Sequence, residues 1–224
     1  MVLRLYFHPL SSFSHKVLIP LYENDTPFEP IVVDFGDPAS LAAFKAVWPM
    51  AKMPALVDTD RGETVAESSI VIEYLDRHHR GAVRFLPDDP DLAREARFWD
   101  RFFDFHVHIL MQQIVGDRLR PEGKSDPTGV EKARRLLRNA YSFIEARMAG
   151  RTWAMGGTFG IADCSAAPAL FYADTAEPIG DQFPETKAYL LRLCARPSYR
   201  RVLKEAKPYF RYFPLEKKPV IPEA

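Results

Sequence analysis

The stretch Met53-Pro54-Ala55-Leu56-Val57, followed after a charged turn by Glu67-Ser68-Ser69-Ile70, decides the fold of this chain. Its first part is typical of a buried strand that begins after a proline, because Pro54 has no N–H to give to a sheet ladder. Its second part predicts the start of a helix, since apolar residues recur at helical intervals after it. Two polar residues, Glu67 and Ser68, are therefore expected at a helix N-terminus beside a buried strand.

This arrangement suits a zwitterionic amino-acid head group. The free N–H groups and the positive dipole end of a helix N-terminus attract a carboxylate. The side chain of Glu67 beside them suits an ammonium. Taken alone, a proline-led strand and an ordinary helix cap explain the same residues, so these two stretches by themselves do not establish a binding site.

Length and composition limit the classes of protein. The chain has 224 residues with 47% hydrophobic content, which is enough for one large or two small domains. Thirty basic and thirty acidic residues cancel, which gives no electrostatic case for nucleic acid or an anionic membrane as a partner. Apolar runs are too short for a membrane span and the start has no signal-peptide layout, so a cytoplasmic location is expected.

Cys164 and Cys194 lie in apolar helical contexts and are predicted to be buried and unreactive.

Secondary-structure patterns predict two different halves. Alternation, proline positions and helical periodicity predict, in order, a strand at 2–7, a helix from Ser11 or Ser12, a strand at 28–33, a helix after Asp37, strands at 53–57 and 63–66, and a helix at 67–79. This order is that of a thioredoxin-like domain, expected over residues 1–80.

The remaining residues predict only helices. Residues 81–91 have the composition of a linker, and residues 92–224 form the second, all-helical domain, with helices expected near 92–118 and 130–148. Asp163, three residues after Gly160, is predicted to close a capping box at the start of a further apolar helix, which is a structural role.

In sequence and order, four motifs resemble the glutathione S-transferase family. They are Leu3-Arg4-Leu5-Tyr6-Phe7, Ser11-Ser12-Phe13-Ser14-His15-Lys16-Val17, Met53-Pro54-Ala55-Leu56, and Glu67-Ser68. The resemblance covers nearly the whole chain, and the second motif is similar to that of the serine-type, zeta/theta-like classes. It implies an α/β thioredoxin-like N-terminal domain plus an all-α C-terminal domain, with glutathione as co-substrate.

The resemblance implies roles for single residues. Ser11, with Ser12 as the alternative, would be catalytic, because a hydroxyl ahead of the first helix donates to the glutathione sulfur and favours its thiolate. Ser11, Phe13, Lys52, Met53, Pro54, Glu67 and Ser68 would bind glutathione, with a cis bond before Pro54 and the γ-glutamyl head on Glu67 and Ser68. Phe13 stands where zeta-type enzymes have cysteine, which argues against maleylacetoacetate isomerisation and disulfide chemistry.

A second, hydrophobic substrate is expected between the two domains. The residues predicted to line its pocket are Leu10, Phe13, His106, Leu110, Met111 and Phe210. No metal is expected, since His106 and His108 flank one residue and cannot share a helical face.

The predicted function is a cytoplasmic, homodimeric detoxification enzyme that conjugates glutathione to small hydrophobic electrophiles. Two alternatives stay open: a non-catalytic ligand-binding or interaction protein with the same fold, and a glutathione-dependent peroxidase. The sequence leaves the electrophile, the class within the family and the physiological role undetermined, because such apolar pockets are loosely specified.

Overall fold

Four short strands form one mixed sheet in the first third of the chain. The computed structural model describes residues 2–223, and in it the strands lie in the order β2-β1-β3-β4. β1 pairs with β2 in parallel and with β3 antiparallel, and β4 is antiparallel to β3. The strands are β1 (Leu3–Phe7), β2 (Glu29–Val32), β3 (Ala55–Asp58) and β4 (Glu63–Ala66).

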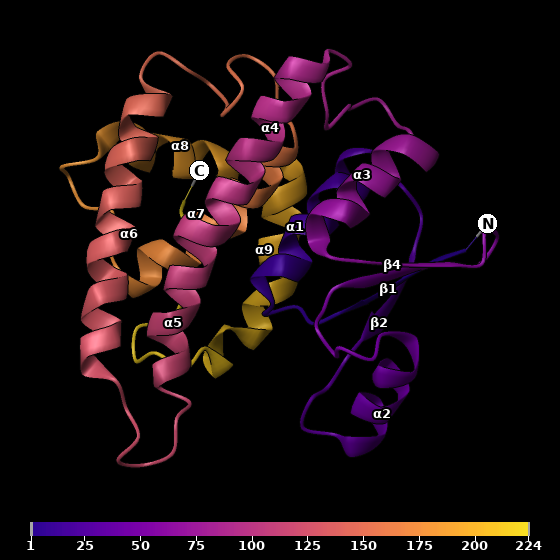
Figure 1. The fold of residues 1–224 in the computed structure, drawn as a ribbon, viewed down its shortest axis with the longest axis horizontal. Helices are drawn as coiled ribbons and strands as arrows, with labels where there is room; N and C mark the ends of the chain where they lie inside the picture. Colours follow the sequence, from indigo (N-terminus) through magenta and orange to yellow (C-terminus); the bar gives the residue numbers. More distant parts are fainter. Residues whose placement is uncertain (1, 224) are drawn as a thin grey trace.

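Helices cover both faces of this sheet. α1 (Ser12–Glu23) and α3 (Ser68–His78) pack on the face that carries the buried side chains of β1, which are Leu3, Leu5 and Phe7. α2 (Pro38–Val47) packs on the other face through Phe44, which is buried against Val33 and Ala55. Figure 1 shows α2 apart from the other helices, below the sheet. The predicted thioredoxin-like order of elements is confirmed.

The rest of the chain is helical, as predicted. α7 runs through its centre and contacts α1 of the sheet-bearing part, so one hydrophobic core continues from the sheet into the helices (Figure 1). The elements are α4 (Pro90–Phe103), the π-helical turn η1 (Asp104–His108), α5 (Ile109–Asp117), α6 (Pro127–Met148), α7 (Ile161–Ala176), α8 (Pro184–Ala195), α9 (Pro197–Ala206) and the 3-10 turn η2 (Lys207–Tyr212).

Asp-Pro pairs start three of the helices. Asp37, Asp89 and Asp126 each cap a helix with their carboxylate, and the proline that follows each one stands in the first turn, where no N–H is needed. The second of these pairs lies inside the segment predicted as linker. Helix α4 therefore begins at Pro90, two residues before the predicted start at 92.

The α4–α5 segment contains one turn that periodicity did not predict. The N–H of Ile109 bonds to the carbonyl of Asp104, five residues back, instead of four. This π-helical turn inserts one extra residue into an otherwise continuous helical rod (Figure 1). Side chains after it are therefore rotated relative to the face that a regular α-helix would present.

The capping of α7 agrees with the sequence prediction. The Asp163 carboxylate accepts hydrogen bonds from the backbone N–H groups of Gly160 and Ala154, both at 2.9 Å, and from the Tyr189 hydroxyl. A Cβ atom on Gly160 would stand 2.9 Å from the carbonyl oxygen of Phe85. Glycine is required here by that close backbone approach, and Asp163 is a buried structural residue.

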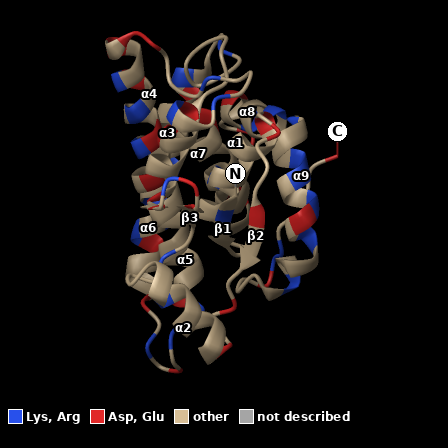
Figure 2. Cartoon of the chain, turned by 90° about the vertical axis from the view of Figure 1, so that its right-hand side faces the viewer, with Lys and Arg blue, Asp and Glu red and all other residues tan. Residues whose placement is uncertain are grey.

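The surface carries charges of both signs, and the two thiols are buried. Figure 2 shows basic and acidic side chains intermixed over the face that it displays. Cys164 and Cys194 are both buried, as predicted, and burial raises the pKa of each thiol. Within residues 2–223, no helix combines the length and the apolar character that a membrane crossing needs.

Candidate active site

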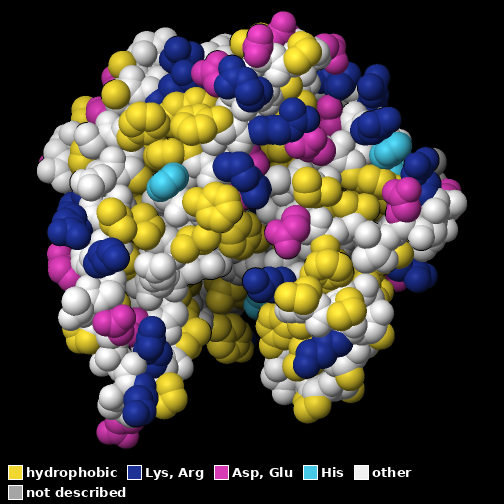
Figure 3. Space-filling view, viewed as in Figure 1, with side chains coloured by type: hydrophobic (Ala, Val, Ile, Leu, Met, Phe, Trp, Pro, Cys, Tyr) yellow, Lys and Arg dark blue, Asp and Glu magenta, His cyan; other side chains and the backbone are white. Residues whose placement is uncertain are grey.

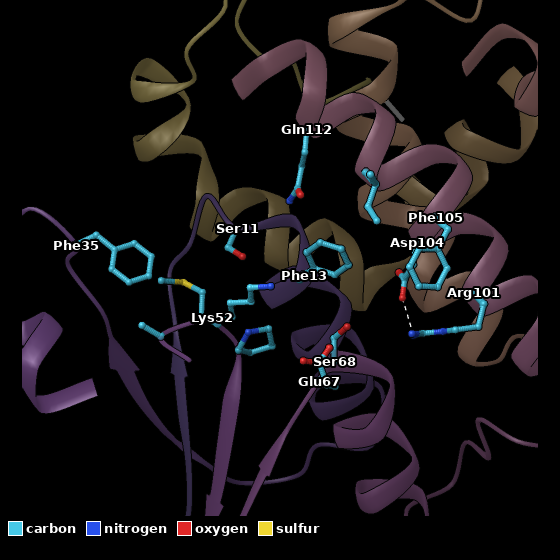
Figure 4. A pocket seen from close by; sticks show the side chains of 14 residues that line it. Ser11, Phe13, Phe35, Lys52, Glu67, Ser68, Arg101, Asp104, Phe105 and Gln112 are labelled. Atoms are coloured by element: carbon cyan, nitrogen blue, oxygen red, sulfur yellow. Dashed lines mark hydrogen bonds and ion pairs between the residues drawn. The ribbon is translucent and has the colours of Figure 1, made fainter. Parts of the chain in front are cut away.

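A cavity of about 500 Å³ lies between the sheet-bearing part and the α4–α5 rod (Figure 4). All seven residues predicted to bind glutathione line it. The structure thus brings together residues from the β1–α1 loop, the approach to β3 and the start of α3. The full lining is Ser11, Phe13, Phe35, Ala51, Lys52, Met53, Pro54, Glu67, Ser68, Arg101, Asp104, Phe105, Ile109 and Gln112.

The approach to β3 offers free backbone to this cavity. The Met53–Pro54 peptide bond is cis, as the resemblance implied. The pairing register of β3 with β1 and β4 begins only at Ala55. The backbone of Met53 therefore precedes the ladder and borders the cavity, where an extended peptide ligand can pair with it.

Ser11 stands at the N-terminus of α1. It is the N-cap residue, and its Oγ accepts a hydrogen bond from the Ser14 N–H at 3.3 Å. A hydroxyl that accepts still carries one proton to donate. Capping α1 and donating to a ligand in the cavity are therefore compatible roles. Ser12 is buried and lines a second cavity instead.

Glu67 and Ser68 mark the start of α3. Glu67 has a left-handed backbone conformation with φ of 67°, which is unusual for a residue with a side chain. Such conformations are held by the surrounding fold and occur often at binding sites. The Glu67 carboxylate makes no capping hydrogen bond and faces the cavity, beside Ser68 (Figure 4).

A buried charge cluster joins the sheet-bearing part to the helices. The Nζ of Lys16, a fully buried residue of α1, lies 2.6 Å from Asp100 Oδ1 and 2.8 Å from Asp104 Oδ2. It also donates to Ser69 Oγ at 2.8 Å, and Ser165 Oγ donates to Asp104 Oδ1 at 2.8 Å. Three polar contacts occupy the three protons of the ammonium. The cluster ties α1, α3, the α4–α5 rod and α7 together.

Two further residues belong to this cluster. Arg101 Nη2 donates to Asp104 Oδ2 at 2.6 Å, and His108 Nδ1 lies 3.5 Å from Asp104 Oδ1. Burial acts to raise the pKa of Asp104, but the hydrogen bond from His108 and the charge of Lys16 outweigh it and hold that pKa well below its usual range. The Asp104 carboxylate is therefore ionised, with its oxygens already engaged.

A second cavity of about 440 Å³ adjoins the first. Ser11, Phe35, Met53 and Gln112 line both cavities. Its walls are mainly apolar, and Leu10 and Met111 are among them, as predicted for the pocket of the second substrate. The other lining residues are His8, Ser12, Asp34, Gly36, Val115, Tyr172, Phe213 and Pro214.

Three predicted pocket residues lie elsewhere. His106 is exposed on the outer side of the rod against the ring of Phe102, and neither it nor Leu110, which is buried, lines either cavity. His106 lies one residue past the cavity-lining Phe105 and Leu110 one residue past the cavity-lining Ile109, so each points away from the cavity face of the rod. Phe210 is also buried, packed on α7, and the tail reaches the second cavity through Phe213.

Sequence reasoning missed several cavity residues. Arg101 and Asp104 line the first cavity, and Phe35 and Gln112 line both. One signal was present in the sequence: Lys16 lies within an apolar helical run, and a buried lysine requires carboxylate partners. Aspartates spaced by four residues on a later helix are suitable partners, but a single sequence does not pair them.

The fold and the cavity define a class of protein. A thioredoxin-like sheet with a cis-proline at its ligand-facing edge, joined to a helical part that closes the cavity, is the architecture of glutathione-dependent transferases. Residues 5–82 match the family model for the glutathione S-transferase N-terminal domain, and residues 98–197 match that for the C-terminal domain. The chain belongs to the glutathione S-transferase family of enzymes.

Individual relatives are similar over most of their length. Glutathione S-transferase U7 of Arabidopsis thaliana is 27% identical over 90% of this chain and 87% of its own. FtsZ-localized protein A of Caulobacter vibrioides is 27% identical over 91% of this chain and 92% of its own. Among solved structures, a Methylobacterium radiotolerans glutathione S-transferase in complex with glutathione sulfonate is 25% identical, with a TM-score of 0.76 over 90% of this chain and 94% of its own. The serine-type, zeta/theta-like assignment stays a prediction.

Proposed function

We propose that this enzyme transfers the thiolate of glutathione to small hydrophobic electrophiles. The observation that carries the proposal is the meeting of Ser11, Met53, Glu67 and Ser68 around one cavity that shares a wall with a second, mainly apolar one. The first cavity has polar groups for a tripeptide, and the second has the apolar walls that a hydrophobic electrophile requires.

Glutathione fits the first cavity in one direction. Its γ-glutamyl ammonium pairs with Glu67, and its γ-glutamyl carboxylate lies at the start of α3 with Ser68. The cysteinyl part pairs with the backbone of Met53, and Lys52 attracts the glycyl carboxylate at the other end. This placement puts the sulfur next to Ser11, with Phe13 beside it.

Ser11 then favours the reactive form of sulfur. A free thiol has a pKa of about 8.5, and a hydrogen bond to the thiolate together with a helix N-terminus lowers it. The thiol proton is released to solvent, the thiolate attacks the electrophilic carbon, and a carbon–sulfur bond forms as the leaving group departs or the epoxide opens. Ser12 lines the second cavity and is the alternative donor.

The test combines binding and turnover. Glutathione is titrated by calorimetry, and the protein is then screened with aryl halides, epoxides and peroxides. Binding with conjugation supports the proposal, whereas turnover of peroxides alone favours the peroxidase alternative that uses the same thiolate. Failure to bind glutathione overturns the proposal.

A non-catalytic role is the second candidate. It is supported by the similarity to FtsZ-localized protein A, whose name describes a location and not a reaction. The two roles differ in the bound thiol: an enzyme lowers its pKa, whereas an interaction protein leaves it at the solution value or binds no glutathione.

We further propose a cytoplasmic homodimer with a role in detoxification and with domains at 1–80 and 92–224 joined by residues 81–91.

The proposed dimer surface consists of α3 and the 92–105 segment. Ile70 and Phe98 are each more than half exposed on these helices, and Figure 3 shows hydrophobic side chains gathered over α4 and the neighbouring α6. Light scattering at micromolar concentration tests the dimer: twice the chain mass of 25.6 kDa is expected. Phe98→Glu should reduce it to the monomer mass.

A further inference from the structure

Among the described residues of the charge cluster that line the first cavity, Arg101 is the one whose side chain is substantially exposed. Its side chain is 43% exposed, against 7% for Asp104 and none for Lys16. It lies at the γ-glutamyl end of the first cavity, close to Ser68 and Glu67 (Figure 4).

Only part of the guanidinium is used within the protein. Nε donates to Asp100 Oδ2 at 3.1 Å, and Nη2 donates to Asp100 Oδ2 at 2.9 Å, to Asp104 Oδ2 at 2.6 Å and to Ser69 Oγ. Nη1 has no hydrogen-bond partner among residues 2–223, although it carries two protons. One edge of the fork is therefore fixed by the cluster while the other is available to a ligand.

The neighbouring charged groups of the cluster have no hydrogen-bonding group left for a ligand. The Lys16 ammonium is surrounded by Asp100, Asp104 and Ser69, and it is fully buried. The Asp104 carboxylate is engaged by Lys16, Arg101 and Ser165, so it does not take the γ-glutamyl ammonium. On this side of the cavity, a cationic donor is left in Arg101 and an anionic acceptor in Glu67.

The guanidinium is also held in place before any ligand binds. Two aspartates fix its Nε and Nη2, and its carbon lies 5.7 Å from the centre of the Phe105 ring, another residue of the cavity wall. A preorganised arginine loses little side-chain freedom on binding and presents its N–H groups in a fixed direction.

We propose that Arg101 binds the γ-glutamyl α-carboxylate of glutathione through Nη1, alongside Ser68 at the start of α3. Arg101 is thereby a binding residue that distinguishes a γ-glutamyl group from an acyl group that lacks this carboxylate. This inference rests on the proposed function, since it assumes that glutathione occupies the first cavity in the direction described above.

The test removes the Arg101 guanidinium from the protein and the γ-glutamyl carboxylate from the ligand, one at a time. Glutathione and 4-aminobutyryl-cysteinyl-glycine, which is glutathione without the γ-glutamyl carboxylate, are titrated by calorimetry into wild type and Arg101→Gln. Arg101→Gln should weaken glutathione binding about tenfold, the loss of one charge-assisted hydrogen bond, and should leave binding of the analogue unchanged. Arg97→Gln is the matched control, because Arg97 is one turn earlier on α4, pairs with Glu73 and lies outside the cavity.

Each other outcome rejects the inference in a recognisable way. An equal loss for both ligands means that Arg101 acts only by supporting the cluster, and no loss for either means that it does not bind the ligand. If Arg101→Gln does not fold, Arg101→Lys retains a charge beside the aspartates but not the planar fork, and it should again weaken glutathione more than the analogue. Wild type that binds neither ligand overturns the proposed function itself.

Discussion

The role of Ser11 gives the sharpest prediction about the reaction. Its hydroxyl caps α1 through a long hydrogen bond of 3.3 Å and has its proton free for the glutathione sulfur. If that proton stabilises the thiolate, Ser11→Ala removes one hydrogen bond to the charged form. The thiol pKa of bound glutathione should then rise by roughly one unit, because about 1.4 kcal/mol of differential interaction corresponds to one unit.

The assay is the ultraviolet absorbance of the thiolate in the binary complex, followed over pH. Below both pKa values, a rise of one unit lowers the thiolate fraction about tenfold, and the rate of conjugation should fall by the same factor. Glutathione affinity should stay close to the wild-type value, since Glu67, Ser68 and the Met53 backbone are the groups proposed to hold the peptide. Loss of the cap should cost roughly 0.5–2 kcal/mol of folding stability, the usual range for replacement of a serine N-cap by alanine.

Two control variants separate the cap from the chemistry. Ser11→Thr retains both a cap and a hydroxyl and should titrate like wild type. Ser12→Ala changes a buried side chain next to Ser11 and should leave the thiol pKa unchanged. A thiol whose pKa is the same in wild type and Ser11→Ala would refute the reasoning, and a shift seen only in Ser12→Ala would assign the hydrogen bond to Ser12.

Three further predictions concern single residues. Glu67→Gln should weaken glutathione binding by about 2 kcal/mol in calorimetry, since it removes the proposed partner of the γ-glutamyl ammonium, whereas Glu73→Gln, outside the cavity, should not; equal affinities would reject the placement. Lys16→Met should cost about 3–5 kcal/mol in urea unfolding because it removes the buried ammonium from two buried carboxylates, which keep only the partly exposed Arg101 as a cationic partner, whereas Lys187→Met breaks a partly exposed pair and should cost less than about 1 kcal/mol; a small loss for Lys16→Met would mean that the cluster is hydrated. Burial lowers the pKa of His15 from 6.5 to about 4, so the unfolded chain takes up this proton at a higher pH than the folded protein does. The wild-type protein should therefore lose folding stability as the pH falls from 6.5 to 4. In His15→Gln, the slope of the unfolding free energy against pH should be smaller by the contribution of up to one proton, and an unchanged slope would contradict the lowered pKa.

The fold and one side of the cavity were predictable because local signals and spacing fix them. Pro54 directly precedes a strand, and Ser11 and Glu67 each stand at the start of a periodic apolar run. Given a thioredoxin-like arrangement, these residues must meet at one edge of the sheet. The structure brings them to one cavity, while their roles toward glutathione stay predictions.

The other side of the cavity was not predictable in the same way. Which face of the α4–α5 rod meets the sheet depends on one extra residue in a helical turn, and periodicity analysis assumes that turn to be regular. The resemblance placed His106 and Leu110 in the pocket only as members of the first helix of the second domain, and each lies one residue past a side chain that lines the first cavity. Arg101 has the sequence context of an ordinary exposed helix residue, and its place in the cavity follows only from tertiary pairing with Asp100 and Asp104.

The π-helical turn also makes the specificity of this site sensitive to chain length. Deleting one residue between Asp104 and His108 would restore a regular α-helix without disturbing any loop. Every later side chain of α5 would then turn by about 100° about the helix axis, which would carry Ile109 and Gln112 away from the cavities and bring other residues to them. A single deletion would thus exchange one whole wall of these two cavities, while Ser11, Glu67 and the rest of the opposite wall kept their places.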